Sequence, residues 1–349
     1  MTTIAPITTV DPRKDELWRT LATGEHGDLF TSPPWIDAVC STYGFTPAAR
    51  IALDADGTPR GGLAWVPVSD LRGDRLCSLP FSDWADPVAP DTATWNALVD
   101  GLIEPGTSLT LRCLHAAEPV ADPRLRITGE TVQHTTRIDA PIEDIHRRID
   151  QAARRNIAKA DRGGIRVEAI SGIRGVQQFH QLQVGLRKRK YRMLAQPVEF
   201  FENIWDRFSA DGSVVTMLAR HAEDTVAGVV FLAWNGILHC KFAASRPDYL
   251  AMRPNDAVYW AGIRWAAERG MRAVDWGASD VDQPGLIRFK SKYATDEKRI
   301  VALKSAGEPS PAQAEAGRVL GDITRLFTDE SVPDRITDEA GALLYRYFC

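Results

Sequence analysis

The feature that most constrains the fold is a series of three apolar segments in the second half of the chain. Residues 213–221, 225–235 and 237–245 have the composition of strands, with many β-branched and aromatic side chains. The pair Asn235-Gly236 lies at the junction of the last two segments, and this dipeptide is a strong signal for a tight hairpin turn. We therefore predict three consecutive antiparallel strands.

The elements around this meander predict the fold class. A helix over 255–269, capped by Asn255 and ended by Gly270, leads into a strand over 271–277. A meander followed by one helix that crosses to a further strand predicts an α+β fold, with mixed helices and strands, rather than a doubly wound sheet. Upstream we expect a helix ended by glycines at 142–162, a strand at 165–170, and helices at 175–193 and 197–212.

The chain length predicts more than one domain. At ~150 residues per domain, 349 residues predict about two. We expect an N-terminal domain over 1–140, a C-terminal domain over 141–308, and a helical extension over 309–349. In the first half, the predicted strands are 47–53, 61–68 and 108–114, and 76–90 is expected to be a strand that leads into a loop. A turn followed by a short helix is expected over 28–43 and a helix over 92–104, and a strand at 299–304 follows those of the second half.

Composition excludes several classes of protein. Hydrophobic residues make up 44% and charged residues 25%, which is ordinary for a globular chain, and the net charge of -4 disfavours a general nucleic-acid binder. The five cysteines form no C-x-x-C pair, which predicts a reduced cytoplasmic chain without a metal site. We also expect neither a secretory signal nor a transmembrane segment. No G-x-G-x-x-G or phosphate-binding P-loop motif is present.

The stretch 268–293 carries the most specific motif. It reads ERGMRAVDWGASDVDQPGLIRFKSKY and resembles the C-terminal signature of the Fem-type aminoacyltransferases and their relatives in the N-acetyltransferase (GNAT) superfamily. Shorter resemblances to this family occur at 154–168, 186–201 and 79–88. The residues that carry the main motif are Gly270, Asp275, Trp276, Gly277, Gly285, Phe289, Lys290 and Tyr293.

The resemblance implies two GNAT-like halves that share a central cleft. It implies a cytoplasmic transferase that moves an acyl group onto a primary amine and forms an amide or peptide bond, with no permanently bound cofactor. In the Fem group the donor is aminoacyl-tRNA and the acceptor is a peptidoglycan precursor, whereas other relatives use other amines or acyl-CoA. Aminoacyl-tRNA or acyl-CoA is therefore the expected co-substrate, and the acceptor is a small-molecule, cell-wall or natural-product amine.

Lys290 is the main candidate for catalysis. Acyl transfer to an amine develops negative charge on the carbonyl oxygen, and the resemblance assigns this lysine to the stabilisation of that charge. The alternative is a solvated lysine in the charged run KSKYATDEK. Phe289 is expected to form a floor for the substrate, or else to be ordinary core.

Acidic and aromatic residues supply the other candidates for the site. Asp83 is a candidate general base or amine anchor, with a turn-forming role as the alternative. Trp84 would either line the same site or be buried in the core. Asp280 follows a predicted strand, and its carboxylate could bind a cationic amine or cap the loop. The residues predicted to contact the substrate are Phe289, Trp276, Trp84, Asp280 and Tyr293.

Two basic stretches favour a ligand that carries phosphates. The helix around 146–159 contains Arg155 and Lys159, and the run at 187–192 contains Lys188 and Arg189. Arginine forks match phosphate geometry, so we predict donor contacts at these four residues. The alternative is a pair of solvated helix faces.

The donor is the point on which the hypotheses differ. Relatives that use acetyl-CoA carry glycines before a helix where backbone amides bind the pyrophosphate, but residues 244–260 contain no glycine. This favours aminoacyl-tRNA. The alternatives are an acyl-CoA bound differently and a degenerate GNAT pair that binds RNA or a polymer precursor without catalysis.

Overall fold

The computed structural model describes residues 7–104, 108–305 and 310–349. These residues form two compact units. The first unit comprises the described residues of 1–131 together with 299–320 and 346–349, and the second unit comprises 132–298 and 321–345. The chain therefore leaves the first unit and returns to it twice.

This division has other limits than the three predicted domains. The chain passes into the second unit inside strand β6 (Leu125–Arg137) rather than at residue 140. The predicted limit at 308 lies outside the described residues. The expected helical extension contains α11 (Pro311–Phe327) and α12 (Asp334–Leu344), whose residues are divided between the two units. The three domains as independently folding parts stay a prediction.

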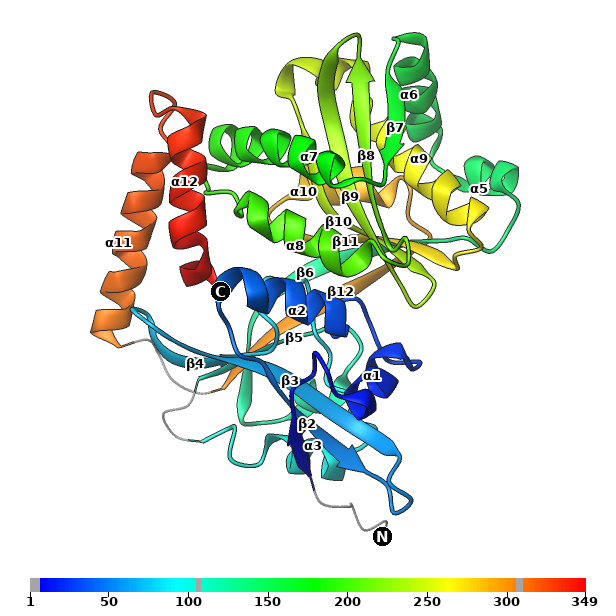
Figure 1. Ribbon diagram of the computed structural model, residues 1–349. Coiled ribbons are helices and arrows are strands. Elements are labelled where there is room, and N and C mark those ends of the chain that lie inside the picture. The colour runs from blue at the N-terminus through cyan, green and yellow to red at the C-terminus, as the bar shows by residue number, and fades with distance from the viewer. Residues whose placement is uncertain (1–6, 105–107, 306–309) are drawn as a thin grey trace. The chain divides into compact units, whose positions relative to one another are not determined.

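The first unit is built on a mixed sheet with the strand order β1-β2-β3-β4-β5-β12 (Figure 1). All neighbouring strands in this order are antiparallel except β4 and β5, which are parallel. The strands are β1 (Thr8–Val10), β2 (Ala48–Leu53), β3 (Pro59–Asp70), β4 (Gly73–Cys77), β5 (Leu109–Cys113) and β12 (Asp296–Ser305), and the helices are α1 (Glu16–Thr23), α2 (Pro33–Tyr43), α3 (Thr92–Val99) and α4 (Ala117–Ala121).

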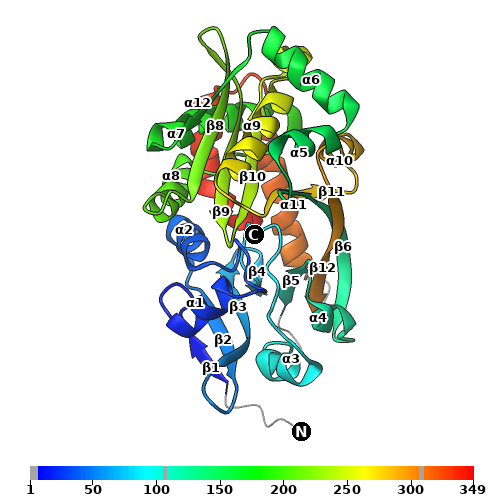
Figure 2. The same ribbon diagram turned by 90° about the vertical axis from the view of Figure 1, so that its right-hand side faces the viewer.

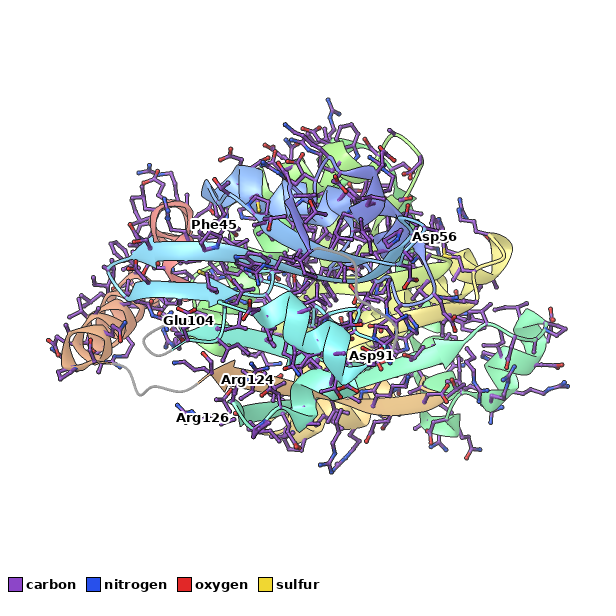
Figure 3. All side chains as sticks on the ribbon, turned by 90° about the horizontal axis from the view of Figure 1, so that it is seen from below. Phe45, Asp56, Asp91, Glu104, Arg124 and Arg126 are labelled. Atoms are coloured by element: carbon purple, nitrogen blue, oxygen red, sulfur yellow. The ribbon has the colours of Figure 1, made fainter. Side chains whose placement is uncertain are left out.

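Local sequence explains the helices of this unit. Ser32 caps α2 as predicted, because its side chain accepts a hydrogen bond from the Trp35 amide while prolines occupy the first turn. Asp91, labelled in Figure 3, caps α3 in the same way through the Thr94 amide. Helix α3 then buries Trp95 and Leu98 against the sheet, which gives this unit its own core.

The second unit is a six-stranded mixed sheet with helices on both faces. Its strand order is β6-β11-β10-β9-β8-β7, and Figure 2 shows α6 and α9 on one face with α7 and α8 on the other. The other strands are β7 (Arg166–Ile170), β8 (Val214–His221), β9 (Asp224–Trp234), β10 (Ile237–Ser245) and β11 (Ala273–Asp280), and the helices are α5 (Ile142–Arg148), α6 (Gln151–Arg162), α7 (Ile173–Leu186), α8 (Val198–Phe208), α9 (Pro254–Glu268) and α10 (Pro284–Ser291).

The meander on which the fold prediction rests is present. Strands β8, β9 and β10 pair antiparallel, and Asn235 and Gly236 turn the chain with φ of 45° and 72°. Helix α9 then crosses to β11, which is parallel to β10. The predicted α+β class is thus confirmed.

Several elements differ from the prediction. Asp150 accepts a hydrogen bond from the Ala152 amide and starts a new helix, so the expected helix over 142–162 is two helices. The helix expected over 175–193 changes at Arg187 into a π-helical turn that ends at Tyr191. The sequence analysis missed β6 and α10, together with β1, α1 and α4.

Two kinds of feature are absent from the described residues. In the part of the chain that the structure describes, no helix combines the length and apolar character needed to cross a bilayer. Among the same residues, no group of three or more His, Cys, Asp or Glu side chains is arranged to hold a metal ion.

Candidate functional site

Strands β10 and β11 of the second unit separate after a short paired region. Their parallel register runs from Ile237 opposite Ala273 to His239 opposite Asp275, although both strands continue for at least five more residues. On its other edge β10 has a register shift between Cys240 and Phe242. Beyond His239 and Asp275, the described structure pairs β10 and β11 no further, so the facing backbone N–H and C=O groups do not join the two strands. Such groups need other partners, and this region is therefore the first candidate for a site.

The Asp-Trp-Gly motif shapes the backbone just beyond this separation. Gly277 has a φ of 69°, a left-handed conformation that favours glycine. The Asp275 carboxylate is buried and accepts a hydrogen bond from the Gly277 amide at 2.6 Å and another from the Gln133 side chain on β6. Asp275 therefore holds the turn of the chain at Gly277, and this turn decides where the next two carbonyl groups point.

Lys290 extends from α10 to these carbonyl groups. Its side chain is only 5% exposed, and its Nζ donates to the oxygens of Gly277 at 3.0 Å and Ala278 at 2.9 Å. Burial of an ammonium group is costly unless hydrogen bonds compensate for lost water. The lysine is therefore not the solvated residue of a charged run, and its charge lies in a region of low dielectric at the separated strands.

A buried histidine lies near this lysine. His134 on β6 is fully buried, and its Nε2 lies 3.2 Å from a carboxylate oxygen of Glu297. Burial lowers the pKa of His134, the Glu297 carboxylate opposes this, and the positive charge of Lys290 lowers the pKa further. The sequence analysis did not identify His134, because no strand was predicted over 125–137.

Aromatic rings pack beside Lys290. Trp276 is stacked on Tyr259 with a centroid distance of 4.2 Å, and Phe289 meets Tyr259 edge-on at 4.8 Å. Trp276 and Tyr293 are each 1% exposed, so both occupy core positions, whereas Phe289 is half-buried. Contact of Trp276, Phe289 and Tyr293 with a substrate stays a prediction.

The first turn of α9 contains a buried acid. Asp256 is 3% exposed and accepts hydrogen bonds from the Tyr293 hydroxyl at 2.7 Å and from the Asn156 amide group at 3.2 Å. Burial raises the pKa of this carboxyl group. The predicted amine-binding residue Asp280 is instead exposed at the end of β11, where it accepts a hydrogen bond from Gln283.

The two basic stretches have different surroundings. Arg155 and Lys159 are exposed on α6, whereas Lys188 is 2% exposed and donates to Val332 and Asp334. Arg189 pairs with the second oxygen of Asp334 at 2.7 Å. Phosphate binding by Lys188 and Arg189 stays a prediction, and it would require these internal contacts to break.

The loop 79–88 of the first unit contains Asp83 and Trp84. Asp83 is half-buried, and Trp84 is 2% exposed and packs edge-on against Phe30 at 4.8 Å. The more buried acid of this loop is Asp86, which accepts backbone hydrogen bonds from residues 114–116. Burial and the nearby Asp86 raise the pKa of Asp28 to about 8. Asp83 and Lys290 belong to different units.

A family model matches part of the second unit. Residues 146–291 match the model of an acetyltransferase (GNAT) domain. The matched range includes the separated strands β10 and β11, helix α9 and Lys290. This part of the chain is therefore similar to a GNAT domain, which supports the acyltransferase class predicted from the sequence.

Solved structures show the same fold over most of the chain. FemX is 15% identical, with a TM-score of 0.63 over 85% of this chain and 97% of that protein. L-PGS from Bacillus licheniformis is 14% identical, with a TM-score of 0.53 over 90% and 98% of the two chains. A tandem GNAT protein from the clavulanic acid biosynthesis pathway is 11% identical, with a TM-score of 0.53 over 87% and 99%. These structures share the fold that the predicted resemblance to Fem-like proteins of the GNAT superfamily implies.

A match to a curated protein is short. A 78-residue segment is 33% identical to the plasma membrane fusion protein prm-1 of Neurospora crassa. The aligned segment is 22% of this chain and spans a tenth of that protein's length. It carries no argument about the fold or the activity of this chain.

Proposed function

We propose that the chain is an N-acyltransferase that transfers an aminoacyl group from aminoacyl-tRNA to a primary amine of a small molecule or of a cell-wall or natural-product precursor. The observation that carries the proposal is the position of Lys290. Its ammonium group is buried and fixed by two main-chain carbonyls beside the separated ends of β10 and β11.

The proposed chemistry uses this fixed charge. The neutral amine attacks the acyl carbon, a C–N bond forms, and the carbonyl oxygen becomes an oxyanion in the tetrahedral intermediate. The buried ammonium of Lys290 stabilises that oxyanion more strongly than it could in water. The intermediate then collapses, the bond to the leaving oxygen breaks, the attacking nitrogen loses a proton to give the neutral amide, and the leaving oxygen takes up a proton in its place. The role of Asp83 as general base or amine anchor stays a prediction.

The start of α9 supports tRNA over an acyl-CoA bound in the usual GNAT manner. No glycine occurs between residues 244 and 260, and Pro254 lacks an amide proton in the first turn. The same turn contains the buried carboxyl group of Asp256. A diphosphate there would meet side chains where glycine would allow close approach, and it would lie near an acidic group.

Exposed cations support a phosphate-bearing donor elsewhere on the second unit. Arg155 and Lys159 lie one turn apart on α6 and are exposed. We propose that they contact the phosphates of the donor. A matched control is Arg174, an exposed arginine at the start of α7.

The donor is tested by mass spectrometry of reactions that contain charged tRNA, amine acceptors and the full chain. The expected result is an aminoacylated amine whose formation stops when the charged tRNA is first digested with ribonuclease. A product that forms equally well after digestion would contradict the tRNA donor. Absence of any product across aminoacyl-tRNA and acyl-CoA donors, with binding retained, would favour a non-catalytic module instead.

An acyl-CoA is the second candidate donor. The match of residues 146–291 to an acetyltransferase domain favours acyl-CoA as the donor. A thermal shift with CoA that is lost in the Arg155→Ala/Lys159→Ala variant, together with amide formation from acyl-CoA alone, would establish this alternative.

A further inference from the structure

Two cysteines of the first unit, far apart in sequence, meet beside one arginine. Arg75 and Cys77 are two residues apart on β4, so both side chains emerge on the same face of this strand. The Nη2 of Arg75 donates to the sulfur of Cys349 at 3.3 Å. The thiol of Cys77 lies near enough to that of Cys349 for each to shift the pKa of the other. The structure thus places two reduced thiols and a guanidinium group together.

The surrounding contacts fix this arrangement. Arg75 forms a two-pronged pair with Asp70 at 2.9 Å for both bonds, and these side chains are 11% and 5% exposed. Arg72 donates to the main-chain oxygens of Tyr347 at 3.0 Å and Cys349 at 3.4 Å. The segment that carries Cys349 is therefore held against β4 by two arginines, and Arg75 cannot turn away without breaking both of its hydrogen bonds to Asp70.

The two sulfurs differ in chemical character. The thiol of Cys77 and the charge of Arg75 lower the pKa of Cys349 against the opposing effect of burial, whereas the thiol of Cys349 and burial raise the pKa of Cys77. The thiolate is the nucleophilic form of cysteine. Cys349 is also partly exposed, so small solutes can reach its sulfur, whereas Cys77 is buried.

We propose that Cys349 is a site of oxidation by hydrogen peroxide and that Cys77 resolves the product as an intramolecular disulfide. Neither thiol belongs to the acyl-transfer site proposed above, so this inference stands independently of the donor and of the acyltransferase activity.

The two steps balance with peroxide as the oxidant. The Cys349 thiolate attacks one oxygen of the peroxide, an S–O bond forms, the O–O bond breaks, and the departing hydroxide takes up a proton to become water. The sulfur is oxidised to a sulfenic acid and the peroxide is reduced. The Cys77 sulfur then attacks the Cys349 sulfur, the S–S bond forms, the S–O bond breaks, and the thiol proton of Cys77 leaves with the hydroxide as a second water.

The other cysteines provide internal controls. Cys40 and Cys113 lie in the same unit and are buried. Burial raises the pKa of Cys40 to about 12 and also raises the pKa of Cys113. Both should remain reduced under conditions that oxidise Cys349 completely.

The test is peptide mapping of the full chain after treatment with hydrogen peroxide near equimolar concentration at pH 7, with dimedone to trap sulfenic acid. In the wild type we expect a Cys77–Cys349 disulfide that a thiol reductant reverses. In Cys77→Ser we expect a dimedone adduct on Cys349, and in Cys349→Ser we expect neither product. Iodoacetamide should label Cys349 at least about 100-fold faster than Cys113 in the folded protein.

Three outcomes would overturn the proposal. These are an unmodified Cys349 under these conditions, a Cys349 whose alkylation is no faster than that of Cys113, and a dimedone adduct that persists in the wild type as it does in Cys77→Ser. The Cys113→Ser variant should oxidise like the wild type, and loss of the disulfide in that variant would also contradict the assignment.

Discussion

Two buried lysines of the second unit have nearly the same exposure and different surroundings. Lys188 is 2% exposed and joins the π-helical turn to Val332 and Asp334 at the start of α12. Lys290 is 5% exposed, and the hydrogen bonds that place it run to two main-chain carbonyls beside separated strands. The first ammonium group connects two elements, whereas the second is fixed where a reacting group could be stabilised. Burial alone therefore does not distinguish a structural lysine from one proposed to act in catalysis.

The largest expected effect is on activity at Lys290. Lys290→Met removes the charge and preserves much of the side-chain volume, so we expect kcat for amide formation to fall by about 100- to 1,000-fold, the range for loss of one group that stabilises an oxyanion. Steady-state assays with whichever donor supports amide formation measure the change. Unchanged turnover in a folded Lys290→Met variant would remove the catalytic assignment.

The next effect is on stability at Asp334. Asp334→Ala leaves the buried ammonium of Lys188 without its carboxylate partner, and because Asp334 is itself 46% exposed we expect the free energy of unfolding to fall by about 2 kcal/mol. Urea unfolding measures the change. The matched control is Glu330→Ala, which removes an exposed ion pair with Arg192 and should cost less than about 1 kcal/mol. Equal losses in the two variants would show that Lys188 is not a structural connection.

The Asp334 contribution should depend on pH. Burial acts against the shift, but hydrogen bonds from Arg189 and Lys188 lower the pKa of Asp334 below its usual 3.8. A lowered folded-state pKa stabilises the protein above the unfolded pKa, and this contribution is lost as pH falls below it. The difference in unfolding free energy between wild type and Asp334→Ala should therefore shrink from pH 6 to pH 3, and a constant difference would contradict the ion pair.

His134 should give a smaller pH effect near the other lysine. Burial lowers the pKa of His134 below 6.5, so the unfolded chain binds a proton that the folded chain does not. Its neutral form stabilises the fold above pH 6.5, and that contribution is lost as pH falls below this value. We expect His134→Gln to reduce the loss of stability between pH 7 and pH 5, as measured by thermal unfolding, and an identical pH profile would disprove the assignment.

The smallest expected effect concerns the exposed cations. Arg155→Ala/Lys159→Ala should raise the KM for a tRNA donor by about tenfold and make binding less sensitive to salt, while stability stays unchanged. Arg174→Ala should leave KM at the wild-type value. A double variant that behaves like Arg174→Ala would remove these residues from the donor site.

Much of the second unit could be predicted from its sequence because local signals agreed with the fold. The turn at Asn235-Gly236 and the apolar segments around it fixed three strands and their order. Strand β6 was missed because its first half is exposed and polar, as in ITGET, and lacks the alternation of apolar and polar residues that predicts a strand. Without β6, neither Gln133 nor His134 could be placed near the site.

The state of each basic residue could not be predicted for a different reason. The sequence of the run at 187–192 shows five cations in six positions, but the partners of Lys188 lie more than 140 residues later. Tertiary contacts of this kind decide whether a lysine is solvated or buried. By contrast, Gly277 could be recognised from its motif, because its left-handed backbone is a local requirement.

The pairing of β12 with β5 has a consequence for synthesis of the chain. Val301 lies opposite Cys113 and Lys304 lies opposite Thr110, so the strand that pairs with this edge of β5 is nearly 200 residues later in the sequence. On the ribosome the first unit cannot close its sheet until the whole of residues 132–298 has emerged. The part made first is therefore finished last, and its open strand edge is where a nascent chain would need protection from premature association.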